Sequence, residues 1–133
     1  MISELTRLRA LGFKLALDDV GAGNAGLEML RHLPVDYVKI DREVIVDSAS
    51  GGAARAVLLA VVAFSAELGA YVIAEGIETE AMLEHVRHPH RRSGTPQRMG
   101  VQGVQGYLLG RPSTAPLTVP ADLSGERDDL TVG

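Results

Sequence analysis

Four acidic residues and one lysine lie where short apolar runs of the sequence end. Asp18 and Asp19 follow the first run, Lys39 and Asp41 lie at the end of the second, and Glu75 follows the third. Adjacent carboxylates bind Mg²⁺ or Mn²⁺, and cations held in this way accept a phosphate group. The alternative is that each acid caps the helix that follows it, where the helix dipole favours a carboxylate. Because three successive runs each deliver a carboxylate, we favour a shared site over separate caps.

The apolar runs have the length of strands and alternate with longer, helix-like stretches. We expect strands at Phe13–Leu17, Tyr37–Ile40, Tyr71–Ala74 and Val101–Val104. We expect helices at Ser3–Ala10, Asn24–His32, Ala53–Leu68 and Thr79–Arg87. The strand runs are continuous rather than alternating, which is typical of strands covered on both faces. The pattern predicts an α/β fold of βα units around a parallel sheet, with its chemistry at the C-terminal ends of the strands.

The composition of the 133 residues is that of an ordinary globular protein, so one domain is the expected organisation. Seventeen acidic and 13 basic residues give a formal net charge of −4, and we therefore predict no nucleic-acid polymer as a partner. The absence of cysteine excludes disulfides and thiolate metal sites and fits a cytoplasmic location. The longest apolar run, Ala56–Phe64, is far below the roughly 18 residues of a membrane-spanning helix. No membrane span is therefore expected.

A GxGxxG motif lies between the first predicted strand and the next helix, at Gly21, Gly23 and Gly26. With Asp41 about twenty residues further on, it matches the fingerprint of a dinucleotide-binding unit. Asp18 and Asp19, however, stand directly before the turn and would repel the pyrophosphate that such glycines admit. Lys39 is also unusual beside a ribose-binding acid. Dinucleotide binding is therefore the weaker of two alternative functions.

Three stretches of the sequence together resemble the C-terminal half of the EAL family, the bacterial cyclic-di-GMP phosphodiesterases. They are LALDDVGAGNAGLEMLRHLPVDYVKIDREVI, YVIAEGIETEAML and VQGYLLGRP. The resemblance implies that residues 1–112 form a partial EAL domain, about four βα units of a (β/α)8 TIM-type barrel. It also implies a role in signalling in the cytoplasm. The reaction would be the hydrolysis of one phosphodiester bond of cyclic-di-GMP to linear pGpG, assisted by two Mg²⁺ or Mn²⁺ ions.

The same resemblance implies a role for each candidate site residue. Asp18 would be the carboxylate shared by the two metal ions, Asp19 would hold the second ion alone, and Lys39 would polarise the attacking water. Glu75 matches the family's essential glutamate, as a ligand of the second metal and as a candidate general base, two roles that the sequence does not separate. Three further residues match positions that line or support the site: Asp41, Gln105 and Glu78.

The resemblance also implies what is missing. A complete barrel of this type has eight strands and about 250 residues, whereas we expect four strands in this chain. The Glu-Ala-Leu motif, and an asparagine and a glutamate that complete the shell of the first metal, belong to the other half. We therefore expect the chain to be a truncated domain that is inactive by itself. The loop after the aspartates departs from the family at Ala22 and Asn24, which replace a threonine and an aromatic residue.

Two segments fall outside the βα pattern. Residues 85–100 are rich in histidine and arginine and contain no acid, so we expect a basic loop inserted in the domain. A transition-metal site on His85, His88 and His90 is the alternative, disfavoured because the neighbouring arginines would repel a cation. Residues 113–133 contain prolines and turn formers without periodicity and predict a flexible C-terminal tail.

Truncation suggests an alternative to catalysis. A degenerate EAL module could bind cyclic-di-GMP without cleaving it, or pair with a second copy or with another EAL protein. Pairing would cover the strand edges and apolar faces that a partial barrel exposes.

Overall fold

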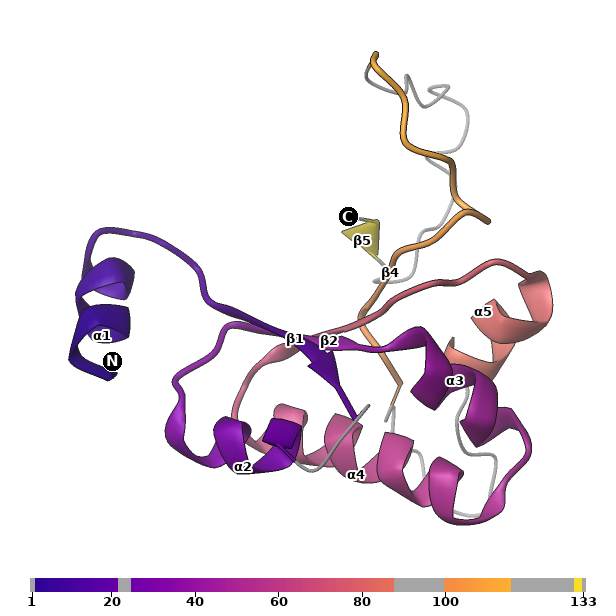
Figure 1. Cartoon of the computed structure of the whole chain (residues 1–133), viewed down its shortest axis with the longest axis horizontal. Coiled ribbons are helices and arrows are strands. Elements are labelled where there is room, and N and C mark those ends of the chain that lie inside the picture. Colours follow the sequence, from indigo (N-terminus) through magenta and orange to yellow (C-terminus); the bar gives the residue numbers. More distant parts are fainter. Residues whose placement is uncertain (1, 22–24, 88–99, 116–130, 133) are drawn as a thin grey trace.

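The computed structural model describes residues 2–21, 25–87, 100–115 and 131–132. Its helices are α1 (Ile2–Ala10), α2 (Ala25–His32), α3 (Arg42–Ala49), α4 (Gly52–Glu67) and α5 (Glu80–Arg87). Its strands are β1 (Ala16–Val20), β2 (Tyr37–Ile40), β3 (Tyr71–Ala74), β4 (Gly103–Val104) and β5 (Thr131–Val132). Helices and strands alternate along the chain as far as α3, and α4 follows α3 directly before β3 and α5 (Figure 1). The α/β class predicted from the sequence is confirmed.

The strands form one parallel sheet in the order β1-β2-β3-β4-β5. Helices α2 and α4 pack against this sheet, and α3 packs between α4 and α5 (Figure 1). A sequential parallel order is that of a barrel segment, whereas a dinucleotide-binding fold starts in the middle of its sheet and reverses direction. The strand order therefore supports the partial barrel and argues against dinucleotide binding. Of the three motif glycines, Gly23 lies outside the described residues.

One face of the sheet carries the hydrophobic core. Along β2 and β3 burial alternates, because residues on one face are buried and those on the other are half-buried. The buried apolar residues of β2, β3 and α4 are Val38, Ile40, Val72, Ala74, Leu58, Val61 and Val62. On the other face Tyr37 and Tyr71 meet edge to face, with ring centroids 5.9 Å apart. The described helices thus cover one face of the sheet. The continuous apolar runs had predicted that both faces would be covered.

Four elements differ from the sequence prediction by more than one residue. Strand β4 begins two residues later than expected, at Gly103, and β5 was not predicted. Strand β1 begins three residues later than expected and continues to Val20, so Asp18 and Asp19 lie within the strand. Helix α3 was not predicted. Its N-terminus is capped by Asp41, whose Oδ1 accepts a hydrogen bond from the Glu43 N–H at 2.7 Å. The β-branched run from Val44 to Val46 has low helix propensity, so the sequence pattern did not indicate this helix.

The two irregular segments are only partly described. The predicted basic loop begins later than expected, because His85–Arg87 form the last turn of α5, and residues 88–99 lie outside the described residues. In the C-terminal segment, β5 pairs with β4, and residues 116–130 and 133 lie outside the described residues. The insertion and the flexible tail stay predictions. None of the described helices is long and apolar enough to cross a membrane.

Candidate metal-binding site

A β-bulge brings the two adjacent aspartates to one edge of the sheet. Leu17 of β1 pairs with Val38 of β2, and Val20 pairs with Ile40, so β1 carries one extra residue over this interval. Asp19 has a φ of 53°, in the left-handed region that aspartate tolerates better than most residues. Neighbouring side chains of a regular strand point to opposite faces. A bulge re-aims a side chain, and here it lets adjacent carboxylates share a site.

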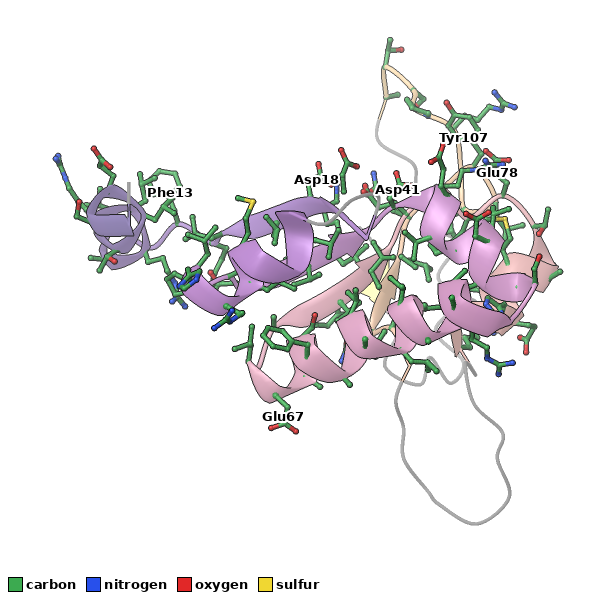
Figure 2. The ribbon with its side chains drawn as sticks, turned by 60° about the horizontal axis from the view of Figure 1, so that its bottom comes forward. Phe13, Asp18, Asp41, Glu67, Glu78 and Tyr107 are labelled. Carbon is green, nitrogen blue, oxygen red and sulfur yellow. The ribbon has the colours of Figure 1, made fainter. Side chains whose placement is uncertain are left out.

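Three carboxylates converge at this edge. Oxygen atoms of Asp18, Asp19 and Glu75 all lie within 4.8 Å of one another. The two aspartates are exposed and Glu75 is half-buried, and Asp18 projects from the edge that also carries Asp41 (Figure 2). Carboxylate oxygens are hard ligands that suit Mg²⁺ and Mn²⁺. Within the described ranges, this is the one group of three candidate ligands close enough to share an ion.

Lys39 provides the positive charge of the site. Its Nζ lies 2.6 Å from Glu75 Oε1 and 3.3 Å from Asp18 Oδ1. Strand β2 places it beside Ile73 of β3, one step before that strand's end. The hydrogen bond to Glu75, opposed by partial burial, raises the pKa of Lys39 above its usual value. Lys39 is therefore an ammonium group that donates hydrogen bonds and cannot serve as a base near neutral pH.

The two acids beside Lys39 differ in their affinity for a proton. Burial raises the pKa of Glu75, and the hydrogen bond with Asp18 adds to this effect while Lys39 opposes it. For Asp18, burial acts in the same direction, but hydrogen bonds with Glu75 and Lys39 prevail and lower its pKa. The Asp19 backbone N–H also donates to Asp18 Oδ1 at 3.1 Å. The surroundings therefore favour the ionised form of Asp18 and disfavour that of Glu75.

The backbone around Glu75 is held by its neighbours on both sides. The Glu75 N–H donates to the Ile40 carbonyl at 3.0 Å, and the Ile77 N–H donates to the Gln105 carbonyl at 3.0 Å. The Leu108 N–H in turn donates to the Ile77 carbonyl at 3.0 Å. The Ile77 side chain is fully buried. Segments from three βα units thus fix the turn that carries Glu75.

The structure places the remaining predicted site residues at the same edge but outside the carboxylate group. One carboxylate oxygen of Asp41 accepts the hydrogen bond that caps α3. Gln105 follows β4 directly, and its side chain is exposed. Glu78 forms an ion pair with Arg42 at 3.1 Å, between Oε2 and Nη2. Their roles toward a substrate stay predictions, and Arg42 is a site neighbour that sequence reasoning missed.

The histidine alternative is not supported by the part of the segment that is described. His85 Nε2, on α5, lies 2.7 Å from Ser48 Oγ, on α3, and Ser48 is fully buried. Burial and, to a lesser extent, the charge of Arg55 lower the pKa of His85. The Ser48 hydroxyl also donates a hydrogen bond to the Ile45 carbonyl at 2.7 Å. The imidazole of His85 therefore links α5 to α3. His88 and His90 lie outside the described residues.

The fold and the site define an α/β barrel segment with an acidic, lysine-containing cluster at the carboxyl ends of its parallel strands. The chain matches the EAL domain over residues 1–112. It therefore belongs to the EAL family, as its three motif stretches predicted.

The chain is similar to proteins that are named cyclic di-GMP phosphodiesterases and to structures solved in complex with c-di-GMP. The chain is 38% identical to the cyclic di-GMP phosphodiesterase NbdA of Pseudomonas aeruginosa, over 81% of this chain and 12% of that protein. It superposes on the P. aeruginosa MucR phosphodiesterase in complex with c-di-GMP with a TM-score of 0.67 and 34% identity, covering 92% of this chain and 47% of that one. It superposes on the manganese/c-di-GMP complex of Klebsiella pneumoniae BlrP1 with a TM-score of 0.65 and 34% identity, covering 83% of this chain and 26% of that one. The chain spans less than half the length of each.

Proposed function

We propose that this chain supplies the C-terminal half of a cyclic-di-GMP phosphodiesterase site. The observation that carries the proposal is the convergence of three carboxylates and Lys39 at the C-terminal edge of the sheet. This is the edge at which barrel enzymes carry their chemistry. The names of the NbdA and MucR relatives support cyclic-di-GMP as the substrate. A cytoplasmic location stays a prediction.

In this proposal Asp18, Asp19 and Glu75 would hold divalent Mg²⁺ or Mn²⁺ ions, and Asp18 would be a ligand of both. Bound ions of this kind polarise a phosphoryl oxygen and stabilise negative charge in the transition state. Lys39 donates a hydrogen bond to the attacking water, for which its raised pKa keeps it charged. Glu75 is both a ligand and the candidate base that receives the water's proton. Asp41, Gln105 and Glu78 line or support the site.

The 133 residues are proposed to be inactive by themselves. Hard divalent cations take about six oxygen ligands each, and the cluster offers carboxylates from only three described residues. The remaining ligands would come from the other half of an EAL domain. With that half in place, the reaction adds one water across one phosphodiester bond and yields linear pGpG.

The test is complementation. The chain is mixed with the N-terminal half of an EAL domain, and pGpG release from cyclic-di-GMP in Mn²⁺ is followed by chromatography. We expect hydrolysis by the mixture only, and none with Asp18→Ala. Asp47→Ala, which removes an exposed acid of α3 that is not part of the cluster, serves as the matched control and should retain activity. A folded, associated complex that neither binds nor cleaves cyclic-di-GMP would overturn the proposal.

The alternative, a non-catalytic module that pairs with a second copy or another EAL protein, is favoured by one observation. Leu11 and Phe13, between α1 and β1, are 66% and 59% exposed, and β1 is the edge strand of the described sheet. Exposed apolar side chains beside an open strand edge favour association. Sedimentation velocity distinguishes the outcomes, because a chain that stays monomeric at high concentration excludes self-pairing.

A further inference from the structure

The side chain of Arg42, at the start of α3, crosses the turn that follows Glu75. A Cβ atom on Gly76 would lie 2.6 to 2.8 Å from the Cβ, Cγ and Cδ atoms of Arg42. The methylene stem of Arg42 therefore lies directly on the Gly76 backbone. Beyond it, the guanidinium Nη2 reaches Glu78 Oε2 at 3.1 Å. Arg42 thus spans the turn from Gly76 to Glu78.

Gly76 is the adaptable residue of this turn. Its φ of +66° lies in the left-handed region, which glycine adopts at little cost. The residues on either side are held through the Glu75 and Ile77 amides, whereas Gly76 has no side chain with which to pack. The Arg42 stem supplies that packing, and the ion pair with Glu78 holds the stem in place.

The energetics of the ion pair indicate where its effect should be seen. The side chains of Arg42 and Glu78 are 48% and 43% exposed, and an exposed ion pair contributes little to stability. A restraint on the residue after Glu75 instead limits where the Glu75 carboxylate can lie. Small errors in the placement of a ligand reduce metal affinity, and partners of the ligands are correspondingly important.

We propose that Arg42 is a positioning residue which, with Glu78, holds the Glu75 carboxylate in place against Lys39 and the two aspartates. This inference rests on the proposed function of the cluster as a divalent-metal site. It assigns Arg42 no contact with substrate or metal. The two parts of the side chain have separate tasks, the stem packing on Gly76 and the guanidinium binding Glu78.

The experiment titrates Mn²⁺ alone into the full chain and its variants by isothermal calorimetry. Loss of a group that orients a metal ligand costs about 10–100-fold in affinity, and we expect Arg42→Ala to weaken Mn²⁺ binding about tenfold, at the lower end of that range. Glu78→Gln should have a similar but smaller effect. Arg42→Lys keeps the stem and the charge and should bind within about threefold of the wild type. Arg42→Met keeps the stem alone and separates the two tasks.

The matched control is Arg87→Ala, which removes an exposed arginine paired with Glu84 on α5. It should leave Mn²⁺ affinity unchanged. If Arg42→Ala binds Mn²⁺ as the wild type does while Asp18→Ala loses binding, the positioning role is overturned and the metal site stands. Thermal unfolding of every variant shows whether the fold is intact, and recovery by Arg42→Lys excludes a general loss of structure.

A second readout decides the inference if the wild-type chain binds no Mn²⁺, a result that would count against the proposed function. Amide hydrogen exchange at Glu75 and Ile77 reports directly on the turn. We expect about tenfold faster exchange in Arg42→Ala at these two amides, with no change at Val72, whose N–H donates to the Gln102 side chain. Unchanged exchange at Glu75 and Ile77 overturns the positioning role.

Discussion

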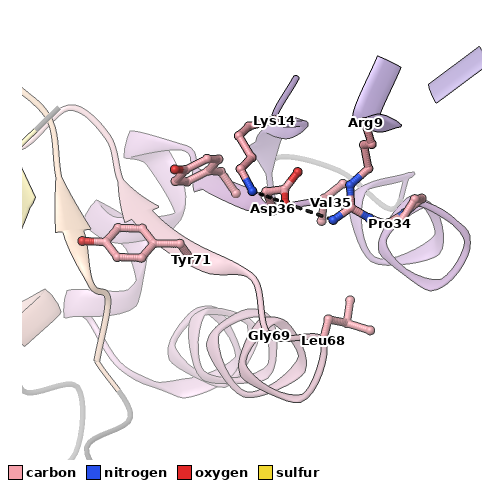
Figure 3. A pocket seen from close by; sticks show the side chains of 9 residues that line it. Arg9, Lys14, Pro34, Val35, Asp36, Leu68, Gly69 and Tyr71 are labelled. Atoms are coloured by element: carbon pink, nitrogen blue, oxygen red, sulfur yellow. Dashed lines mark hydrogen bonds and ion pairs between the residues drawn. The ribbon is translucent and has the colours of Figure 1, made fainter. Parts of the chain in front are cut away.

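The two ends of the parallel sheet carry charged side chains in opposite proportions. At the N-terminal end, Asp36 is the acid. It accepts a hydrogen bond from the Leu15 N–H at 2.9 Å and pairs with Arg9 at 3.0 Å and Lys14 at 3.5 Å (Figure 3). The Leu15 N–H above all, and then the two cations against partial burial, lower the pKa of Asp36. One acid thus has two cationic partners and a backbone donor.

At the C-terminal end the proportions are reversed, since three carboxylates lie together with one cation, Lys39, which pairs with Asp18 and Glu75. A cavity of about 370 Å³ lies at the N-terminal end, lined by the charged groups around Asp36 (Figure 3). With two cations for one carboxylate, it lacks the excess negative charge that attracts a metal ion. An excess of carboxylates, rather than hollow space, therefore identifies the candidate metal site of this molecule.

The largest expected effect is the loss of metal binding in Asp18→Ala. Removing a direct ligand should weaken Mn²⁺ binding by about 100-fold or more, because loss of an outer-shell partner alone costs about 10–100-fold. The free energy of unfolding should change by no more than about 0.5 kcal/mol, as for other exposed sites. Calorimetry with Mn²⁺ and urea unfolding measure the two quantities. Equal metal affinity in the variant would remove the distinction between the two ends.

Gly106→Ala should disturb the C-terminal end through packing. An added Cβ would overlap the backbone N and O atoms of Ile77, and such overpacking costs about 1–3 kcal/mol. Faster hydrogen exchange at Ile77 should accompany the loss of stability. The control is Gly69→Ala at the N-terminal end, where nothing lies within 4 Å of the added atom and the left-handed backbone alone costs about 1–2 kcal/mol. It should leave the exchange at Ile77 unchanged.

Asp36→Ala should affect structure and leave metal binding intact. The Leu15 N–H loses its acceptor, and Arg9 and Lys14 lose the carboxylate that holds α1 near the sheet. We expect a decrease of a few degrees in the midpoint of thermal unfolding, with unchanged Mn²⁺ affinity by calorimetry. A decrease in Mn²⁺ affinity comparable with that of Asp18→Ala would contradict the assignment of separate roles.

The smallest expected effect is an opposite response of the two ends to acid. The pKa of Asp36 is below its ordinary value of 3.8, so its contribution to stability is present above 3.8 and is lost as the pH falls through the folded value. The pKa of Glu75 is above its ordinary value of 4.5, so its contribution is present below 4.5 and is lost as the pH rises through the folded value.

Urea unfolding across the acidic range, with a chelator present, measures this difference. Asp36→Asn should remove part of the acid-induced loss of stability, whereas Glu75→Gln should remove part of the gain. At each pH the free energy of unfolding of the wild type is subtracted from that of the variant, because Asp18 titrates together with Glu75. Parallel pH profiles for both variants would show that the two ends do not differ in this respect.

The central strands were predicted correctly, and the elements around them less well. β2 and β3 have the predicted bounds, since short apolar runs between helical stretches leave little choice. β1 was placed three residues too early, because its pairing with β2, which includes the bulge, decides where it ends. Helix α3 was missed because its β-branched residues favour a strand locally. Packing of α3 against α4 and α5 overrides that preference.

The sequence by itself determined the class of fold, the family and the acids that end the strands. The tertiary structure decided which of these acids meet. Asp18, Asp19 and Glu75 converge because a bulge and the strand register bring them together, whereas Asp41 turns to cap a helix. Arg42 and Glu78 lie 36 positions apart and meet only in space. Charge–charge contacts depend on distance rather than on sequence separation, so the folded sheet had to set them.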